Sequence, residues 1–171
     1  DGKRVAELIR EEIKGEARKL AGKGVIPGLA VVLVGNDPAS EVYVRNKRKA
    51  CNELGISAFD YDLPADCSEK RLLALIEKLN QDSKVHGILV QMPLPGQIDS
   101  KKVLNAIDPR KDVDGFHAIN VGRMVQGLPG FVPATPHGIM LLLEHYQLNT
   151  KGMHAVVIGR SNIVGRPISI L

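Results

Sequence analysis

The chain has 171 residues, of which 44% are hydrophobic and 25% are charged, a composition typical of a folded globular protein and not of a disordered one. Its net charge of +4 is small and its aromatic content is only 4%, which argues against nucleic-acid binding and favours small anionic ligands. No apolar run approaches the length of a membrane span, and the two cysteines, Cys51 and Cys67, have neither metal-binding nor redox spacing.

The first half of the chain is predicted to alternate helices and strands. The spacing of apolar residues predicts six segments: a helix over 3–21, a strand over 29–34, a helix over 40–54, a strand over 56–63, a helix over 68–79 and a strand over 86–90. Ser40 is expected to be the N-cap of the second helix, and Gly55 suits its C-terminal end. Alternation at this spacing implies right-handed βαβ units, so we expect an α/β fold with a parallel sheet.

After residue 90 the pattern changes. Two prolines exclude regular structure at 91–96, and a short helix is expected at 99–106. The remaining segments are a long irregular stretch over Asp108–Thr135, a helix over 136–147 that begins at Pro136, a linker over 149–152, a strand over 155–158 and a glycine turn over 159–167. We therefore predict two domains, a first one at 1–148 and the start of a second at 149–171.

Polar groups that can carry chemistry follow the predicted strands. Tyr43 and Lys47 are four residues apart and share one face of a helix, Gln91 ends a strand, and Asp112 and Asp114 lie in the long loop. A lysine desolvated beside an aromatic ring can transfer protons near neutral pH, and a carboxylate can accept two N–H donors from an amidine edge. The set suits acid–base chemistry on a flat, nitrogen-rich heterocycle bound at the carboxyl edge of the sheet. An ordinary surface helix and a plain Asp–Gly turn are the structural alternatives.

The segment that starts at Gly159 reads as a strand-to-helix glycine turn. It departs from the G-x-G-x-x-G fingerprint, because Ser161 takes the second glycine position and the last glycine, Gly165, comes one residue late. Free N–H groups at a helix start, the hydroxyl of Ser161 and the guanidinium groups of Arg160 and Arg166 would still suit a phosphate. The alternative is a turn with a structural role alone.

The five histidines have no metal-ligand spacing, so no metal site is predicted. His117 and His137 are interpreted as loop contacts and the others as structural residues. We find no Ser/His/Asp arrangement, no H-E-x-x-H motif and no P-loop.

Five motifs together give the chain a specific likeness. They are Ser40–Lys47, Val90–Pro95, Lys111–Phe116, Pro133–Gly138 and Gly159–Pro167. In this order and spacing the chain closely resembles the methylenetetrahydrofolate dehydrogenase/methenyltetrahydrofolate cyclohydrolase family, the bifunctional folate enzymes. Members of that family are considerably longer, so the chain looks like their catalytic domain followed by the opening of a Rossmann-type, dinucleotide-binding domain.

The resemblance implies oxidation of 5,10-methylenetetrahydrofolate by NADP, with NAD as the alternative, and hydrolysis of the methenyl product to 10-formyltetrahydrofolate in one-carbon metabolism. It implies that Lys47 is the general acid/base, that Tyr43 stacks on the folate, that Gln91 tunes the lysine and that Asp114 holds the pterin edge. The cofactor-binding residues that it implies are Gly159, Arg160, Ser161 and Gly165. It also implies a homodimer at full length and a cytoplasmic location, with the mitochondrial matrix as the alternative.

Two other classes of function stay open at this point. One is a folate-binding module without dehydrogenase turnover, and the other is a two-domain nucleotide-binding protein with an unknown ligand. Thermal stabilisation by folate analogues and by NADP separates these hypotheses, since each predicts a different pattern of stabilising ligands.

Overall fold

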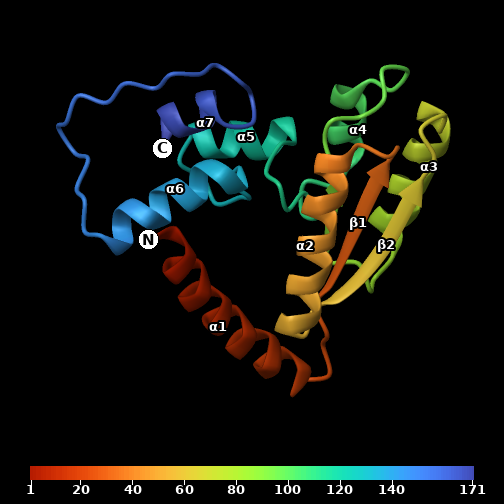
Figure 1. The fold of residues 1–171 in the computed structure, drawn as a ribbon, viewed down its shortest axis with the longest axis horizontal. Coiled ribbons are helices and arrows are strands. Elements are labelled where there is room, and N and C mark those ends of the chain that lie inside the picture. The colour runs from red at the N-terminus through yellow and green to blue at the C-terminus, as the bar shows by residue number, and fades with distance from the viewer.

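Three parallel strands form the sheet around which the elements are arranged: β1 (Gly28–Val34), β2 (Ser57–Leu63) and β3 (Gly87–Val90). The computed structural model describes residues 1–171 (Figure 1). The strand order is β2-β1-β3, so the most apolar strand lies in the centre, with β2 and β3 hydrogen-bonded to its two sides. This confirms the predicted α/β class and the parallel sheet.

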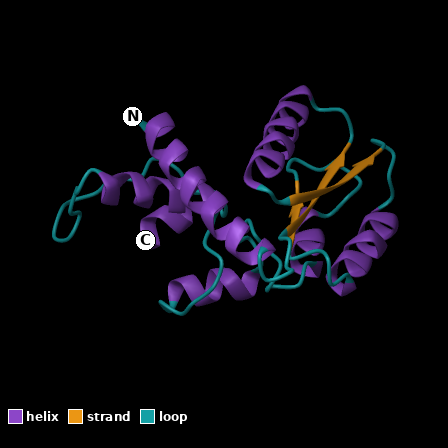
Figure 2. Cartoon of the chain, turned by 90° about the horizontal axis from the view of Figure 1, so that it is seen from below, coloured by secondary structure: helices purple, strands orange, loops and turns teal.

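Seven helices accompany the sheet. They are α1 (Gly2–Ala21), α2 (Pro38–Leu54), α3 (Glu69–Gln81), α4 (Ser100–Ala106), α5 (Ala118–Val125), α6 (Ala134–His145) and α7 (Gly165–Ile170). Helices lie on both faces of the sheet, as Figure 2 shows from below. None of the helices is both long enough and apolar enough to cross a membrane.

Alternation along β1 divides the core into two layers. Ala30, Val32 and Val34 pack in the larger cluster with the apolar side of α3, which includes Leu72 and Ile76. The residues between them, Val31 and Leu33, face the other way and pack with Val44 of α2 and Leu89 of β3. Because both faces of β1 are covered, a nearly continuous apolar run forms this strand.

Helix α2 begins earlier than predicted. Asp37, and not Ser40, is its N-cap, and the carboxylate of Asp37 accepts the Ser40 N–H over 2.8 Å. Pro38 explains the difference, since a proline keeps the preceding residue out of the helical conformation and is itself well suited to the first helical position. The other end is confirmed, because Gly55 ends the helix with a left-handed φ of +76°.

The stretch Asp108–Thr135 is not irregular throughout, because it contains α5. The ring Nδ1 of His117 caps α5 by accepting the Ile119 N–H over 3.0 Å. Histidine is not among the preferred capping residues, so the sequence carried no ordinary start signal for this helix. Helix α6 likewise starts at Ala134, which leaves Pro136 inside the first turn and not at its beginning.

Residues 155–158, predicted to form a strand, pair with no strand in the structure. They run as an extended, exposed segment, seen as the long arc that leads to α7 in Figure 1. Ile158 is 99% exposed, although its sequence context is that of a buried strand. A strand needs a neighbour to receive its backbone hydrogen bonds, and the three-stranded sheet offers none at this position.

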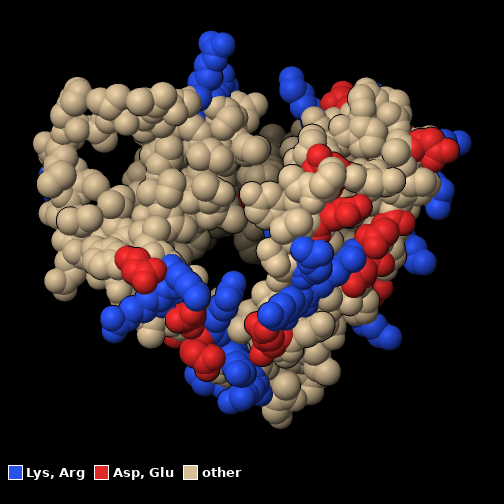
Figure 3. Space-filling view, in the orientation of Figure 1, with Lys and Arg blue, Asp and Glu red and all other residues tan.

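Charge is distributed unevenly over the surface. Figure 3 shows Lys, Arg, Asp and Glu side chains gathered over the half that contains α1, α2 and β2, with both signs interspersed. The half with α6 and α7 is almost free of charge in this view, and several apolar side chains there are exposed, including Met153, Val156 and Ile158.

Candidate active site

The carboxyl ends of β1 and β3 bring Lys47 and Gln91 together. Lys47 lies on α2, which follows β1, and Gln91 is the first residue after β3. The Lys47 amine donates a hydrogen bond to Oε1 of Gln91 over 3.1 Å. Both side chains are half-buried, so the contact lies at the edge of the sheet and not in its core.

The main chain fixes the orientation of the Gln91 amide. Its Nε2 donates to the carbonyl oxygen of Met92 over 2.7 Å, which leaves the acceptor oxygen of the amide for Lys47. Ser40 lies against the same carbonyl, with its hydroxyl 3.5 Å from the Met92 oxygen, and is 2% exposed. The sequence predicts only a helix cap for Ser40 and does not reveal this contact, because nothing local links positions 40 and 92.

Asp114 belongs to the same group of side chains. Burial away from water raises the pKa of its carboxyl, the positive charge of Lys47 opposes that rise, and the negative charge of Asp112 adds to it. Asp112 forms a parallel bridge with Ile88 of β3, so the chain at Asp114 runs towards the end of β3 that Gln91 follows. The lysine, the amide and the carboxylate predicted from the sequence therefore lie at the same edge of the sheet.

Tyr43 lies one helical turn before Lys47 on α2. The residue is 61% exposed, so the ring is not part of the apolar core. An exposed ring beside an amine presents an open aromatic face on which a planar ligand can stack. The structure thus places Tyr43 on the rim of the group, whereas Lys47, Gln91 and Asp114 form its more buried part.

The opposite flank of α2 has different electrostatics. Arg48 donates to Asp60 over 2.7 Å and to Asp62 over 2.5 Å, two acidic residues on one face of the edge strand β2. The hydrogen bond to Asp62 is the main reason why the pKa of the Arg48 guanidinium is raised. Of the four basic residues at this point of α2, Arg45, Lys47, Arg48 and Lys49, it is Lys47 that contacts Gln91.

The glycine turn brings Gly159 and Gly165 into close contact. A Cβ on Gly165 would lie 2.5 Å from the carbonyl carbon of Gly159, whose φ is +153°. The hydroxyl of Ser161 accepts the N–H groups of Val164 and Gly165 over 3.1 and 3.2 Å. This geometry fits a turn whose main chain must come close to a ligand, which is the use that dinucleotide-binding turns make of glycine.

The two arginines of this turn, Arg160 and Arg166, are exposed and form no ion pair. Their guanidinium groups are therefore available to a phosphate. No group of three or more His, Cys, Asp and Glu side chains is arranged to hold a metal ion.

Two family models match the chain. The catalytic domain of tetrahydrofolate dehydrogenase/cyclohydrolase matches residues 1–114, and the NAD(P)-binding domain of the same enzymes matches residues 133–171. The chain therefore belongs to the tetrahydrofolate dehydrogenase/cyclohydrolase family. The family expected from the five motifs is confirmed, as is a catalytic α/β domain followed by part of a cofactor domain, whereas the boundary at 148 stays a prediction.

Individual relatives agree over the whole chain. It is 58% identical to the bifunctional protein FolD of Geotalea uraniireducens, over 100% of this chain and 61% of that protein. The crystal structure of the bifunctional enzyme FolD from Campylobacter jejuni is similar at a TM-score of 0.98 and 50% identity, over 99% of this chain and 61% of that one. The chain thus spans about 60% of the length of the relatives it matches.

A more distant structure is also similar. It is the N5,N10-methylenetetrahydrofolate dehydrogenase-cyclohydrolase of Trypanosoma brucei, solved in complex with NADP cofactor and an inhibitor. The TM-score is 0.95 at 36% identity, over 99% of this chain and 59% of that chain. The backbone is therefore closely similar even where nearly two thirds of the aligned residues differ.

Proposed function

We propose that this chain provides the folate site, and the beginning of the nucleotide site, of a bifunctional methylenetetrahydrofolate dehydrogenase and methenyltetrahydrofolate cyclohydrolase. The enzyme would oxidise 5,10-methylenetetrahydrofolate with NADP, or with NAD, and hydrolyse the product to 10-formyltetrahydrofolate in one-carbon metabolism. The observation that carries the proposal is the 3.1 Å hydrogen bond between Lys47 and Gln91 at the carboxyl edge of the sheet. The positive charge of Lys47 also acts on the pKa of Asp114. The names of the relatives support the proposal.

The cyclohydrolase step assigns a role to each of four side chains. Tyr43 stacks on the folate, and Asp114 accepts N–H groups from the edge of the pterin. Lys47, as an amine held in place by Gln91, takes a proton from the water that attacks the methenyl carbon. The same proton can then pass to the ring nitrogen that leaves that carbon, which opens the ring. The proton that remains on the attacking oxygen is lost to solvent, so the products are the formyl group and one released proton.

The dehydrogenase step needs a nicotinamide cofactor, which accepts the hydride when it is bound. Gly159 and Gly165 would let its phosphates approach the main chain, and Ser161 would hold the turn through its bonds to the helix start. Arg160 would pair with the 2′-phosphate that distinguishes NADP from NAD. The folate edge and this turn would thus hold the two reactants of one hydride transfer.

A folate-binding module without dehydrogenase turnover is the second candidate. The chain spans about 60% of the length of its relatives, and residues 155–158 pair with no strand within it. Both facts concern the cofactor domain and not the folate site. Tetrahydrofolate derivatives are the ligands in both cases.

For a protein that contains this chain we infer a homodimer in the cytoplasm, with the mitochondrial matrix as the alternative compartment. Sedimentation would check the dimer, and cell fractionation would check the compartment.

Thermal stabilisation of the chain separates the two candidates. We use 5-formyltetrahydrofolate as a stable probe of the folate site and NADP as a probe of the turn. Stabilisation by both supports the bifunctional enzyme, and stabilisation by the folate alone supports the binding module. If neither ligand stabilises a well-folded chain, the folate proposal is wrong.

A matched pair of lysine variants tests the chemistry. Lys47→Gln should slow hydrolysis of methenyltetrahydrofolate in a protein that contains this chain by about 10²-fold or more, while the probe still binds. Lys49→Gln is the control. Lys49 is two residues away on the same helix, but it is exposed and its amine lies 3.8 Å from the carboxylate of Glu53. Hydrolysis near the parental rate in Lys47→Gln would refute the role of this amine.

A further inference from the structure

Asp112 is a buried carboxylate that no step of the proposed chemistry uses. The residue is 1% exposed and takes part in no ion pair of the protein. A carboxylate removed from water needs hydrogen bonds to replace its hydration, and without a cation it depends on neutral N–H donors alone. Those donors therefore reveal which part of the chain this side chain holds in place.

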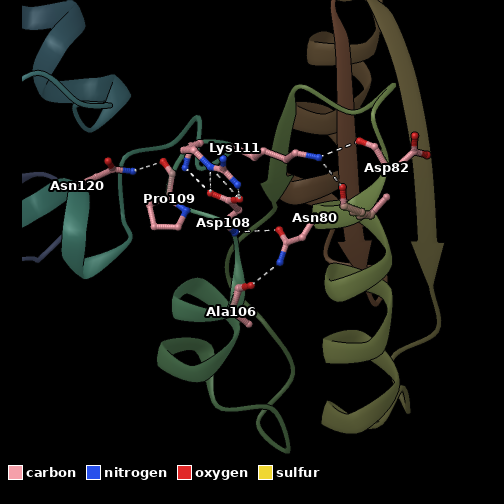
Figure 4. A network of polar contacts seen from close by, with 9 residues as sticks. Asn80, Asp82, Ala106, Asp108, Pro109, Lys111 and Asn120 are labelled. Carbon is pink, nitrogen blue, oxygen red and sulfur yellow. Dashed lines mark hydrogen bonds and ion pairs between the residues drawn. The ribbon is translucent and has the colours of Figure 1, made fainter.

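All the donors come from the segment that follows Asp114. Oδ1 of Asp112 accepts the Phe116 N–H over 3.3 Å, and Oδ2 accepts the His117 N–H and the Asn120 side-chain amide, each over 2.9 Å. Asn120 is 1% exposed and also donates to the carbonyl oxygen of Pro109 over 2.8 Å, a contact drawn in Figure 4. Asp112 thus ties the chain before Asp114 to the chain after it.

A tight turn lies between these two attachment points. The Gly115 N–H donates to the carbonyl oxygen of Asp112 over 3.1 Å, and Gly115 has a left-handed φ of +69°. A Cβ at Gly115 would lie 2.6 Å from the carbonyl carbon of Val132, so the turn is also packed from outside. Asp114 is therefore held within a loop that Asp112 closes twice, through its main chain and through its side chain.

The same loop is attached to the sheet and to a helix end. Asp112 forms a parallel bridge with Ile88 of β3, whose N–H donates to the Lys111 carbonyl over 2.7 Å. The Lys111 amine donates to the carbonyl oxygens of Leu79 and Asp82 at the end of α3, over 3.0 and 2.8 Å (Figure 4). A cation there also suits the negative end of the helix dipole, so the loop has a rigid base.

We propose that Asp112 is a positioning residue for Asp114, which holds that carboxylate at the folate-binding edge near Lys47. This inference rests on the proposed function for the identity of the ligand. The positioning itself rests on the hydrogen bonds of Asp112 and on the tight turn that holds the half-buried Asp114. Consistent with both, desolvation raises the pKa of Asp114 and the charge of Asp112 adds to the rise.

The first test compares affinities for 5-formyltetrahydrofolate by calorimetry. Asp112→Asn should raise the dissociation constant roughly tenfold, the equivalent of one lost hydrogen bond to a charged group. Adding Asp112→Asn to Asp114→Asn should cause no further loss, because Asp112 acts through Asp114. Asp108→Asn is the control, since that carboxylate belongs to the same loop but pairs with Arg110. A merely structural role would lower the melting temperature of Asp112→Asn without changing the affinity of the folded protein.

The second test does not need a ligand. Asn120→Ala removes one donor from Asp112 but keeps its charge, so any change at Asp114 reports position and hydration and not a lost neighbouring charge. Carboxyl-carbon NMR should show the pKa of Asp114 falling towards its ordinary value in this variant and staying unchanged in Asp108→Asn. An unchanged pKa in folded Asn120→Ala overturns the proposal, even if Asp112→Asn does not fold. If the parent chain fails to bind the folate probe, the proposed function fails, and the NMR titration still decides whether Asp112 positions Asp114.

Discussion

Lys47 and Gln91 are 44 residues apart in sequence, and the amine of one donates to the amide oxygen of the other over 3.1 Å. The amide cannot turn without cost, because its nitrogen is bonded to the carbonyl oxygen of Met92. The lysine therefore meets a neutral acceptor in a fixed place. A proton-transferring amine gains from such a partner, since its lone pair or its protons are directed without adding another charge.

Gln91→Leu should reduce methenyltetrahydrofolate hydrolysis by about 10²-fold, because it removes the acceptor of Lys47 and the donor of the Met92 carbonyl together. Stopped-flow absorbance of the methenyl substrate measures this loss. Gln97→Leu is the matched control, since the Gln97 amide also donates to a backbone carbonyl, that of Ala65, over 2.6 Å. Equal losses in both variants would mean that packing, and not the contact with Lys47, explains the effect.

Stability should depend on pH through Asp114. Burial raises the pKa of Asp114 in the folded protein above the ordinary value of 3.8, so the folded state binds this proton more tightly than the unfolded state does. The resulting stabilisation is complete below pH 3.8 and is lost as pH rises through the folded pKa. Asp114→Asn should therefore increase the free energy of unfolding at pH 7 but not at pH 3, in urea titrations at both values. The same variant should bind 5-formyltetrahydrofolate more weakly, and an equal gain in stability at both pH values would contradict this account.

Two glycines, one inside a helix and one at a helix end, should respond in opposite directions to alanine. Gly15 lies inside α1 and a Cβ there would meet nothing within 4 Å, so Gly15→Ala should stabilise the protein by about 0.5–1 kcal/mol. Gly55 ends α2 with a φ of +76°, so Gly55→Ala should destabilise it by about 1–2 kcal/mol. Denaturant unfolding of the two variants in parallel provides the measurement. Destabilisation by Gly15→Ala would indicate that α1 is strained at that position.

Disturbing the contact between Gly159 and Gly165 should weaken binding of the nucleotide and not binding of the folate. A Cβ at Gly165 would force the two segments of the turn apart, since it would lie 2.5 Å from the Gly159 carbonyl carbon. Gly165→Ala should weaken NADP binding in a protein that contains this chain at least tenfold and leave binding of 5-formyltetrahydrofolate unchanged. Gly138→Ala in α6 offers a comparison, because a Cβ there would meet nothing within 4 Å and the backbone is helical. Undiminished NADP affinity in Gly165→Ala would exclude this turn from the nucleotide site.

The sequence predicted the elements whose signals are local. The apolar run of β1, the period of α3 behind Ser68 and the glycine at position 55 each carry their information within a few residues, and the structure has them as expected. The positions of Tyr43, Lys47 and Gln91 relative to the sheet followed from the parallel topology alone. Their roles in chemistry stay predictions that the variants above will test.

Other features could not be predicted because their causes are distant in sequence. The Met92 carbonyl that holds Gln91, and against which Ser40 lies, meets Ser40 only after α2 and β3 have packed on β1. Helix α5 begins at a histidine whose ring Nε2 contacts the carbonyl of Asn105, a tertiary contact that propensity does not reveal. Residues 155–158 have the composition of a strand, but pairing depends on a neighbour that composition does not supply.

Helix α1 connects the two ends of the molecule. Near its C-terminus it packs on α2, which carries Lys47, and near its N-terminus it packs on α6, which in turn contacts α7 (Figure 1). A helix of 20 residues is about 30 Å long, so a tilt of about 10° displaces one end by about 5 Å relative to the other. Because α6 also contacts α7, a rotation of α1 about its contact with α2 would move both α6 and α7 relative to the edge of the sheet that carries Lys47.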